Sequence, residues 1–445
     1  MTRLKTRLNA TSAAAAGVPD HRALRFLTAG SVDDGKSTLI GRLLYDSRAI
    51  LADQIDTLEK RAAGSATMEG GPGFDLSLLT DGLEAEREQG ITIDVAFRYF
   101  ATPKRKFIIA DAPGHEQYTR NMVTAAAGSD AAVVLVDITK LDTRSRPVKL
   151  LAQTRRHALL AALLRVPSIV FAVNKLDAVA DPQRAYGAVQ EALLAFAAEA
   201  AIDVAGVVPV SALRGDNVTT PLKVSWYSGP SLLQLLESLP AAQERRTGDL
   251  LLPVQYVARD GEGTGNQPRT LWGRIAHGSV RAGDAVALLP SGQRATVAEV
   301  RLAGDVVDEV IAGQSAGVVL DRQLDVSRGD WIATPDTVRE VNRFSATLAW
   351  LDTEPAVVGR KYLVRHGNRW THARIVEIES VLDIHSLAAT DAHRLAVNDI
   401  GTVVMETQLA LPVEAYETNR VGGALIVVDP ASHRTSGALL VKALI

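Results

Sequence analysis

The sequence predicts an α/β domain with a doubly wound, mostly parallel sheet, followed by two small all-β barrels. Between residues 22 and 239, short apolar runs alternate with stretches of helical periodicity. Continuous apolar runs are typical of parallel strands that helices cover on both faces. Beyond residue 251 the helical periodicity fades, and short Val, Leu and Ile runs recur between Gly, Asp and Pro turns, which is typical of β-barrels. A length of 445 residues suits more than one domain.

Domain boundaries follow changes in composition. Residues 1–21 are basic and then rich in Ala, Ser and Thr, which indicates a disordered tail rather than a targeting peptide, because their apolar part is short. The α/β domain covers residues 22–240, and a polar linker precedes the barrels at 250–336 and 342–445. In the α/β domain we expect strands at 24–29, 107–110, 131–136 and 168–173, and helices at 37–45, 154–164 and 184–198.

Charge and composition exclude several classes of protein. The formal net charge is −3, which gives no general case for binding nucleic acid or a membrane surface. The chain has no cysteine, so disulfides, thiolate metal sites and cysteine nucleophiles are excluded. This composition fits a reducing compartment, and we expect a cytoplasmic protein. No uninterrupted apolar run reaches about 18 residues, so we expect no membrane span.

The first predicted strand leads into a glycine-bounded loop that opens a helix. Residues 30–37 read Gly-Ser-Val-Asp-Asp-Gly-Lys-Ser, the phosphate-binding pattern G-x-x-x-x-G-K-[ST] in its strand–loop–helix context. Backbone N–H groups and the helix N-terminus can cradle phosphate oxygens. Lys36 can reach the β- and γ-phosphates, and the Ser37 hydroxyl can bind Mg²⁺. The predicted nucleotide contacts are Gly30, Ser31, Val32, Asp33, Asp34, Gly35, Lys36, Ser37 and Thr38.

A second motif follows the strand at 107–110. An acid at the end of that strand, Asp111, can hold a water on Mg²⁺, and Gly114 can bring its N–H to the γ-phosphate because it has no side chain. A lone D-x-P-G is usually a turn, but its place downstream of the phosphate loop favours a nucleotide site. We therefore add Asp111, Ala112, Pro113, Gly114 and His115 to the predicted contacts.

A third motif indicates the base. Asp177 of an N-K-x-D sequence can accept hydrogen bonds from guanine N1–H and the 2-amino group, a donor pair that adenine lacks. Asn174 is expected to brace the loops and the stem of Lys175 to cover the base. The sequence Ser-Ala-Leu at 211–213 can supply an N–H for guanine O6. These residues are Asn174, Lys175, Leu176, Asp177, Ser211, Ala212 and Leu213.

Residues 84–94, between the phosphate loop and Asp111, have two readings. They are either a charged helix end followed by a strand, or a switch segment in which the Thr92 hydroxyl binds Mg²⁺ and its N–H reaches the γ-phosphate. The order of the motifs along the chain favours the switch. It predicts that residues 22–240 form a P-loop GTPase domain that binds GTP and Mg²⁺, with Ser37 and Thr92 on the metal.

His115 has its own two readings. A histidine beside a helix start is more often structural than catalytic, but this one directly follows the glycine expected to sense the γ-phosphate. It is therefore placed to orient the attacking water, with Val32 and Ile91 as an apolar gate. The predicted catalytic residues are His115, Lys36, Thr92 and Asp111.

These residues resemble a translation-factor-type GTPase, a G domain followed by two barrels. More narrowly, the Asp33-Asp34 pair and the runs at 41–47, 153–157, 211–218, 226–230 and 419–429 resemble the family of sulfate adenylyltransferase subunit 1, the GTPase subunit of bacterial ATP sulfurylase. The resemblance implies binding to a separate catalytic subunit 2. It also implies that GTP hydrolysis drives ATP and sulfate to adenosine 5′-phosphosulfate and pyrophosphate.

Two departures and two rival readings remain. Residues 140–149 look longer and more basic than the family's loop, which indicates either a tolerated surface insertion or a contact to the partner or a phosphate. No second phosphate loop follows the predicted barrels, so we expect no adenylylsulfate kinase activity. The rivals are an elongation-factor-like GTPase that delivers RNA to the ribosome, which needs a basic barrel face, and a degenerate GTPase that acts as a scaffold.

Overall fold

The structure is a computed structural model of the whole chain, and it describes most of it. The described residues are 23–49, 75–79, 94–114, 119–241, 248–259, 268–383 and 388–445. The predictions made for the tail at 1–21, for Thr92 and for His115 lie outside these residues.

The first part of the chain forms one six-stranded sheet in the order β2-β3-β1-β4-β5-β6. Strands β1, β3, β4, β5 and β6 are parallel, and β2 is an antiparallel edge strand beside β3. The predicted doubly wound, mostly parallel sheet is confirmed. The strands are β1 (Leu24–Ala29), β2 (Ala96–Ala101), β3 (Lys106–Asp111), β4 (Ala131–Asp137), β5 (Ser168–Asn174) and β6 (Val204–Pro209).

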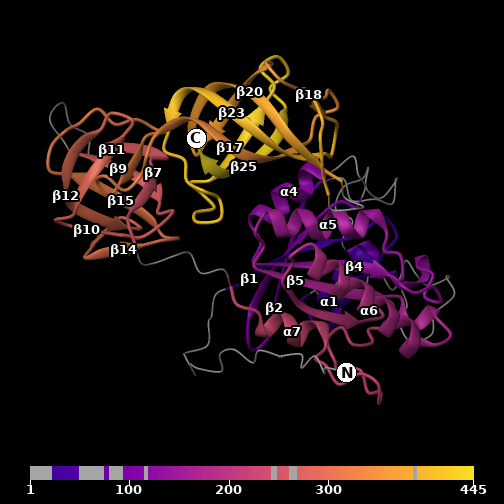
Figure 1. Ribbon diagram of the computed structural model, residues 1–445. Helices are drawn as coiled ribbons and strands as arrows, with labels where there is room; N and C mark the ends of the chain where they lie inside the picture. Colours follow the sequence, from indigo (N-terminus) through magenta and orange to yellow (C-terminus); the bar gives the residue numbers. More distant parts are fainter. Residues whose placement is uncertain are drawn as a thin grey trace, which may run out of the picture.

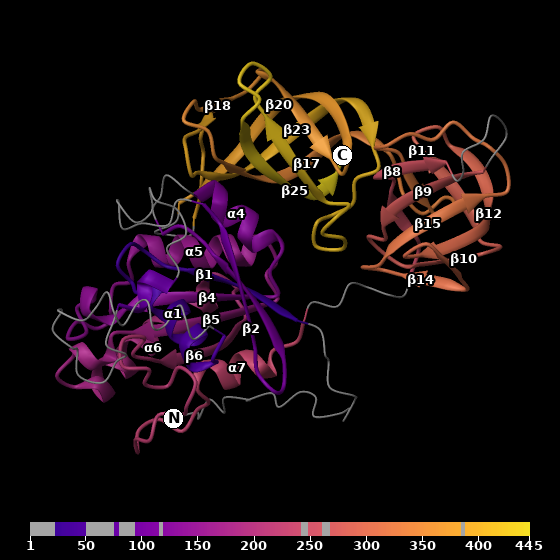
Figure 2. The same cartoon turned by 180° about the vertical axis from the view of Figure 1, so that it is seen from behind.

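Helices cover both faces of this sheet (Figures 1 and 2). Apolar side chains of α4, α5 and α6 pack on one face, and those of α1 and α7 pack on the other. Burial on both faces explains why every residue of β4 and β5 is buried. The helices are α1 (Lys36–Asp46), α4 (Thr119–Ala127), α5 (Ala152–Leu163), α6 (Pro182–Glu199) and α7 (Leu232–Ser238), with short 3₁₀ turns η1 (Leu76–Leu79), η3 (Ile138–Lys140) and η4 (Leu176–Ala178).

Local sequence sets where two of these helices begin. The Asp181 side chain accepts from the N–H of Arg184, and Pro182 occupies the first turn of α6, where its missing N–H is harmless. At α7, Ser231 and Gln234 form a reciprocal capping box. These caps satisfy N–H groups that a helix start leaves without a partner.

The second part of the chain is an eight-stranded sheet that curls on itself. Its order is β7-β16-β11-β12-β15-β9-β8, with β13 beside β12 and a separate β10–β14 ladder. Because only residues 254–255 separate β7 from β8, the two ends of the sheet meet. The strands are β7 (Leu251–Pro253), β8 (Tyr256–Arg259), β9 (Arg269–Arg274), β10 (Ser279–Arg281), β11 (Ala285–Leu289), β12 (Gln293–Leu302), β13 (Asp305–Val307), β14 (Glu309–Ile311), β15 (Ser315–Leu320) and β16 (Trp331–Ala333).

The third part is a closed ring of strands. Its order is β19-β24-β25-β17-β23-β20, and β20 pairs back with β19. A core of its own, which includes Phe344, Trp350 and Tyr362, fills the ring. The strands are β17 (Val341–Trp350), β18 (Ala356–Val357), β19 (Lys361–His366), β20 (Arg369–Leu382), β21 (Ala389–Thr390), β22 (Arg394–Leu395), β23 (Ile400–Leu411), β24 (Ala424–Val428) and β25 (Thr435–Leu444).

This last barrel touches both other parts. The Tyr416 hydroxyl donates to the carbonyl of Leu164 at 2.9 Å, and Tyr416 belongs to the same apolar cluster as α4 and α5. On the other side, the His366 ring stacks on Trp331 of the preceding barrel, with ring centroids 4.7 Å apart. Figures 1 and 2 both show the last barrel above α4 and α5, with the other barrel beside it.

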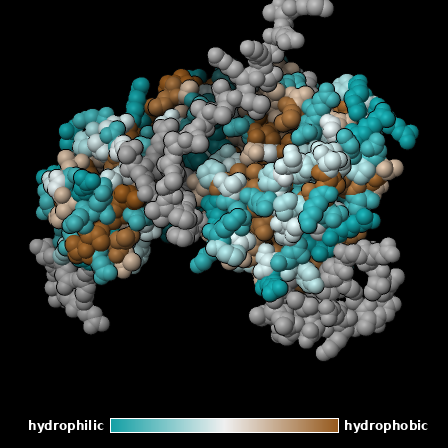
Figure 3. All heavy atoms as spheres, turned by 90° about the horizontal axis from the view of Figure 1, so that it is seen from below, coloured by the Kyte–Doolittle hydropathy of each residue, from teal (hydrophilic) through white to brown (hydrophobic). Residues whose placement is uncertain are grey.

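The surface mixes polar and apolar residues. In the view of Figure 3, hydrophobic residues form separate patches among hydrophilic ones. Large exposed apolar side chains include Phe97 and Tyr99 on β2 and Trp370 on β20. Among the helices that the structure describes, none combines the length and the apolar character needed to cross a membrane.

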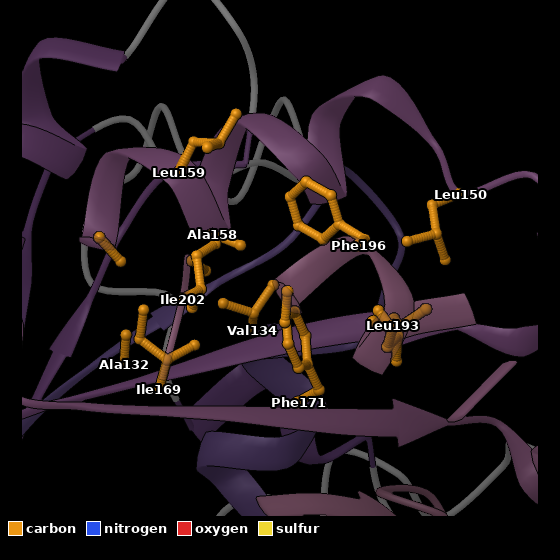
Figure 4. Packing of buried hydrophobic residues seen from close by; sticks show 14 of the residues in the cluster. Ala132, Val134, Leu150, Ala158, Leu159, Ile169, Phe171, Leu193, Phe196 and Ile202 are labelled. Carbon is orange, nitrogen blue, oxygen red and sulfur yellow. The ribbon is translucent and has the colours of Figure 1, made fainter. Parts of the chain in front are cut away.

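Phe171 tests the packing between the sheet and its helices. Its ring is fully buried and lies beside Val134, with Leu193 and Phe196 of α6 above it (Figure 4). We expect Phe171→Ala to lower the free energy of unfolding by about 3–5 kcal/mol, because it leaves a cavity, and Phe171→Leu to cost much less. Urea unfolding followed by the helical circular dichroism signal measures both. Equal stability of the two variants would contradict this account of the core.

Candidate nucleotide-binding site

The predicted motifs gather at one edge of the sheet. The phosphate loop follows β1, the D-x-P-G loop follows β3, the N-K-x-D loop follows β5 and the Ser-Ala-Leu turn follows β6. These four strands are parallel, so their carboxyl ends meet at the same edge. Ligands of open α/β sheets bind at this edge.

Lys36 is the buried cation of the phosphate loop. Its Nζ donates to the carbonyls of Gly30 at 3.0 Å and Ser31 at 2.9 Å. Burial lowers the pKa of Lys36, while the Asp111 carboxylate is the strongest of the nearby charges that raise it. Asp111 is buried and accepts a hydrogen bond from the Thr28 hydroxyl at 3.3 Å. A lysine, an acid and a helix start thus converge where phosphates would bind.

Gly114 approaches this loop so closely that no other residue fits. A Cβ at this position would lie 2.2 Å from Lys36 Nζ and 2.7 Å from the carbonyl oxygen of Gly30. The side chain of Gln153 donates to the Gly114 carbonyl at 3.4 Å and faces His157 Nε2 at 3.2 Å. Burial lowers the pKa of His157 to about 3, so the ring is neutral and can accept from Gln153. The start of α5 therefore supports the D-x-P-G loop.

Asn174 joins three loops. Its Nδ2 donates to the backbone carbonyl of Asp34 at 2.8 Å, and its Oδ1 accepts from the N–H of Ala212 at 2.9 Å. Gly35 is left-handed, with φ of 91°, and a Cβ there would lie 2.5 Å from Asn174 Nδ2. The glycine is therefore required both by its backbone conformation and by the closeness of Asn174.

The rest of the N-K-x-D loop lies around a buried acid. Lys175, left-handed at φ of 64°, places its Nζ 2.8 Å from Asp137 Oδ2. Burial opposes ionisation of Asp137, but hydrogen bonds from Lys175 and Thr139 outweigh it and hold its pKa below the usual range. Leu176 is buried, and Asp177 is half-buried in η4. The Asp177 side chain therefore remains accessible beside the loop.

Arg42 supports the Ser-Ala-Leu turn from α1, a role that the sequence reasoning missed. Its guanidinium donates to the carbonyls of Ala212, at 3.3 Å from Nε, and Leu213. Ser211 and Ala212 are buried, whereas Leu213 is exposed. The signal available in the sequence was an arginine within the mostly apolar run of α1 that follows the phosphate loop.

Asp34, Asp137 and Lys140 form a further cluster that the sequence reasoning did not connect. Asp34 is fully buried, although it lies within the phosphate loop, and Lys140 Nζ lies 2.9 Å from its carboxylate. The neighbouring Asp33 is exposed and left-handed, with φ of 64°. The other predicted contacts are half-buried at Ser31, Val32, Ser37 and Thr38 and buried at Gly30, Ala112 and Pro113.

Two families match this chain. The family described as "Elongation factor Tu GTP binding domain" matches residues 21–243, and that described as "GTP-eEF1A C-terminal domain-like" matches residues 343–442. The first match covers half of the chain and all four loops of the site.

Curated relatives match nearly the whole chain. "Sulfate adenylyltransferase subunit 1" of Laribacter hongkongensis is 41% identical over 94% of this chain and 85% of the relative. "Bifunctional enzyme NodQ" of Azospirillum brasilense is 43% identical over 94% of this chain and 66% of the relative. "Bifunctional enzyme CysN/CysC" of Mycobacterium tuberculosis is 44% identical over 94% of this chain and 67% of the relative. The chain thus spans about two thirds of the length of these bifunctional relatives.

Fold, site and family matches together define a GTPase of the translation-factor class, with a GTP-binding domain and β-rich domains behind it. Within that class, the chain belongs to the sulfate adenylyltransferase subunit 1 family.

Asn174→Ala tests the link between the loops. The substitution removes both hydrogen bonds and leaves a buried N–H and a buried carbonyl without this partner. We expect it to weaken the binding free energy of GDP by about 3 kcal/mol, which is roughly a hundredfold in affinity. A fluorescent GDP analogue measures it. Asn217→Ala is a matched control, because buried Asn217 also makes two backbone hydrogen bonds, to Pro209 and Leu222, but none to the phosphate loop. Equal losses in the two variants would refute a special role for Asn174.

Proposed function

We propose that this chain is the GTP-hydrolysing regulatory subunit of an ATP sulfurylase. GTP hydrolysis would drive a partner, catalytic subunit 2, to make adenosine 5′-phosphosulfate and pyrophosphate from ATP and sulfate in sulfate assimilation. The proposal rests on the relative named sulfate adenylyltransferase subunit 1, which this chain matches over 85% of its length. The convergence of four nucleotide loops at one sheet edge supports GTP as the fuel.

The energetics explain why a GTPase would serve such a reaction. Adenylylsulfate is a high-energy mixed anhydride, so its formation from ATP is strongly uphill. A GTP cycle can supply free energy only if the nucleotide states differ in their contacts with the partner. Its switch face and barrels are therefore the proposed surface for subunit 2. The absence of cysteine is consistent with the reducing cytoplasm, where we place this complex.

The chemistry of the side chains supports our proposal for the phosphate side of the site. Lys36, with its Nζ directed at the loop carbonyls, would meet the β- and γ-phosphates. The Ser37 hydroxyl at the start of α1 suits Mg²⁺, a hard oxygen-seeking ion, and Thr92 would add a second hydroxyl. Asp111, buried at the end of β3, would hold water next to the ion. When bound, Mg²⁺ neutralises charge on the β- and γ-oxygens.

The base side follows from hydrogen-bonding complementarity. Asp177 would accept from guanine N1–H and the 2-amino group, and the backbone around Ala212 would donate to O6. Asn174 and Arg42 would hold these groups in register, since both bond to backbone atoms of this turn.

The elongation-factor-like alternative has less support. The matching GTP-binding family carries an elongation factor's name, but the curated relatives that match 94% of the chain are named for sulfate adenylyltransferase or as bifunctional enzymes. The net charge of −3 also argues against a general affinity for RNA.

One assay decides between these functions. We expect the chain's GTPase rate to rise at least about tenfold when subunit 2, ATP and sulfate are all present, because the partner would complete the active switch conformation. Phosphate release from GTP measures it, with each component omitted in turn. No stimulation under any of these conditions, or stimulation by ribosomes instead, would overturn the proposal.

His115→Ala tests the proposed water-orienting residue. We expect affinity for GTP within about threefold of the original chain and a turnover lower by about 10²-fold or more, because the substitution leaves the other phosphate and base contacts intact but removes the side chain that would orient the attacking water. Single-turnover hydrolysis separates the two effects. His372→Ala, the same substitution at an exposed position of β20, is the comparison and should hydrolyse GTP at the original rate. Unchanged turnover in His115→Ala would rule out this role.

A further inference from the structure

A buried acid sits inside a loop that must hold a polyanion. Asp34 is fully buried, and its Oδ2 accepts from the backbone N–H of Ser31 at 2.6 Å. That bond ties the middle of the phosphate loop back onto its own beginning. An uncompensated carboxylate here would repel the phosphates that the loop is built to bind, so the loop needs a cation at this point.

Lys140 supplies that cation from a distant part of the chain. It lies at the end of η3, after β4, and its Nζ is 2.9 Å from Asp34 Oδ1 and 2.6 Å from the carbonyl oxygen of Val32. Both oxygens belong to the phosphate loop. Lys140 is the first residue of the basic segment 140–149 and, like Arg144, Arg146 and Lys149 of that segment, it is exposed. Its side chain is 33% exposed, but its ammonium group contacts the phosphate loop.

The ammonium group of Lys140 also lies near an acid that contacts the N-K-x-D loop. Its Nζ lies 3.9 Å from Asp137 Oδ2, and the same carboxylate oxygen pairs with Lys175 Nζ at 2.8 Å. Four charges thus alternate in sign, from Asp34 through Lys140 and Asp137 to Lys175. Both acids are nearly inaccessible to solvent and both lysines are partly exposed, so the pairs are less screened than surface salt bridges.

We propose that Lys140 is a positioning residue of the nucleotide site: it neutralises Asp34 within the phosphate loop and holds that loop in register with the N-K-x-D loop. Lys140 acts through Asp34 and Asp137 and needs no contact with the nucleotide. The charges of Asp34 and Lys140 also reach Lys36, since the first raises and the second lowers its pKa. The inference rests on nucleotide binding at this loop, which the unmodified chain reports in the same assay.

The experiment is a double-mutant cycle of charge-removing substitutions in the full chain. Calorimetric titration measures the affinity of each variant for GDP and GTP. Lys140→Gln should weaken GTP binding at least about tenfold and GDP binding by less, because the unpaired Asp34 repels a triphosphate more strongly. Lys140→Arg keeps the charge and should bind within about threefold of the unmodified chain. Lys149→Gln, the same charge change at an exposed position of the segment, should have no effect.

The decisive variant combines two substitutions. Asp34→Asn removes the unpaired charge, so adding it to Lys140→Gln should recover most of the lost GTP affinity, whereas two independent structural defects would add. The proposal is overturned if Lys140→Gln binds GTP within twofold of the unmodified chain, or if the double variant binds no better than Lys140→Gln. Thermal unfolding checks each variant. If Lys140→Gln does not fold but the double variant folds and binds GTP, the result supports the pairing. If neither variant folds, the proposal is overturned. An unmodified chain that binds no guanine nucleotide would refute the proposed function instead.

Discussion

The nucleotide site depends on the side chain of Asn174. A carboxamide has a donor at one corner and an acceptor at the other, and here each corner holds the backbone of a different loop, at Asp34 and at Ala212. Asn174 itself ends β5, which is hydrogen-bonded to β4 and β6. Asn174 thereby anchors both loops to the centre of the sheet. Three segments that are remote in sequence can then present one surface to a single ligand.

Charge in the site is arranged in opposed pairs. Lys36 is buried near Asp111, Asp34 is paired with Lys140, and Asp137 is paired with Lys175. An isolated buried charge would either change its protonation state or attract water, so pairing lets the buried acids keep their charges. The hydrogen bonds of Asp34 and Asp137 to backbone N–H groups, at Ser31 and Thr139, fix the geometry further. The loop can therefore hold acids and still receive phosphates.

Local sequence patterns predicted the strands and the loops of the site, but they did not predict contacts between residues far apart in the sequence. Strand β1 has the predicted bounds because its short run, apolar except for Arg25 and Thr28, ends directly in the glycine loop. The edge strand β2 was not among the predicted strands, because its exposed residues alternate with half-buried ones and with buried Phe100, and it has no continuous apolar run. The partners of Arg42 and Lys140 in the site were not predicted, because they lie 170 and 106 residues away in the sequence. No local pattern encodes such a pairing, since the sheet topology creates it.

Helix α5 joins the site to the last barrel. At its first turn, Gln153 supports the carbonyl of Gly114, the glycine of the D-x-P-G loop. Beyond its last turn, the carbonyl of Leu164 accepts from the Tyr416 hydroxyl at 2.9 Å and from Arg420 at 3.2 Å. Cationic Arg420 also donates to Ala127 at the end of α4, where helix carbonyls carry partial negative charge. A displacement of the D-x-P-G loop would therefore press on the start of a packed helix whose far end contacts the barrel. This contact gives a nucleotide-dependent change a physical route to the surface proposed for the partner.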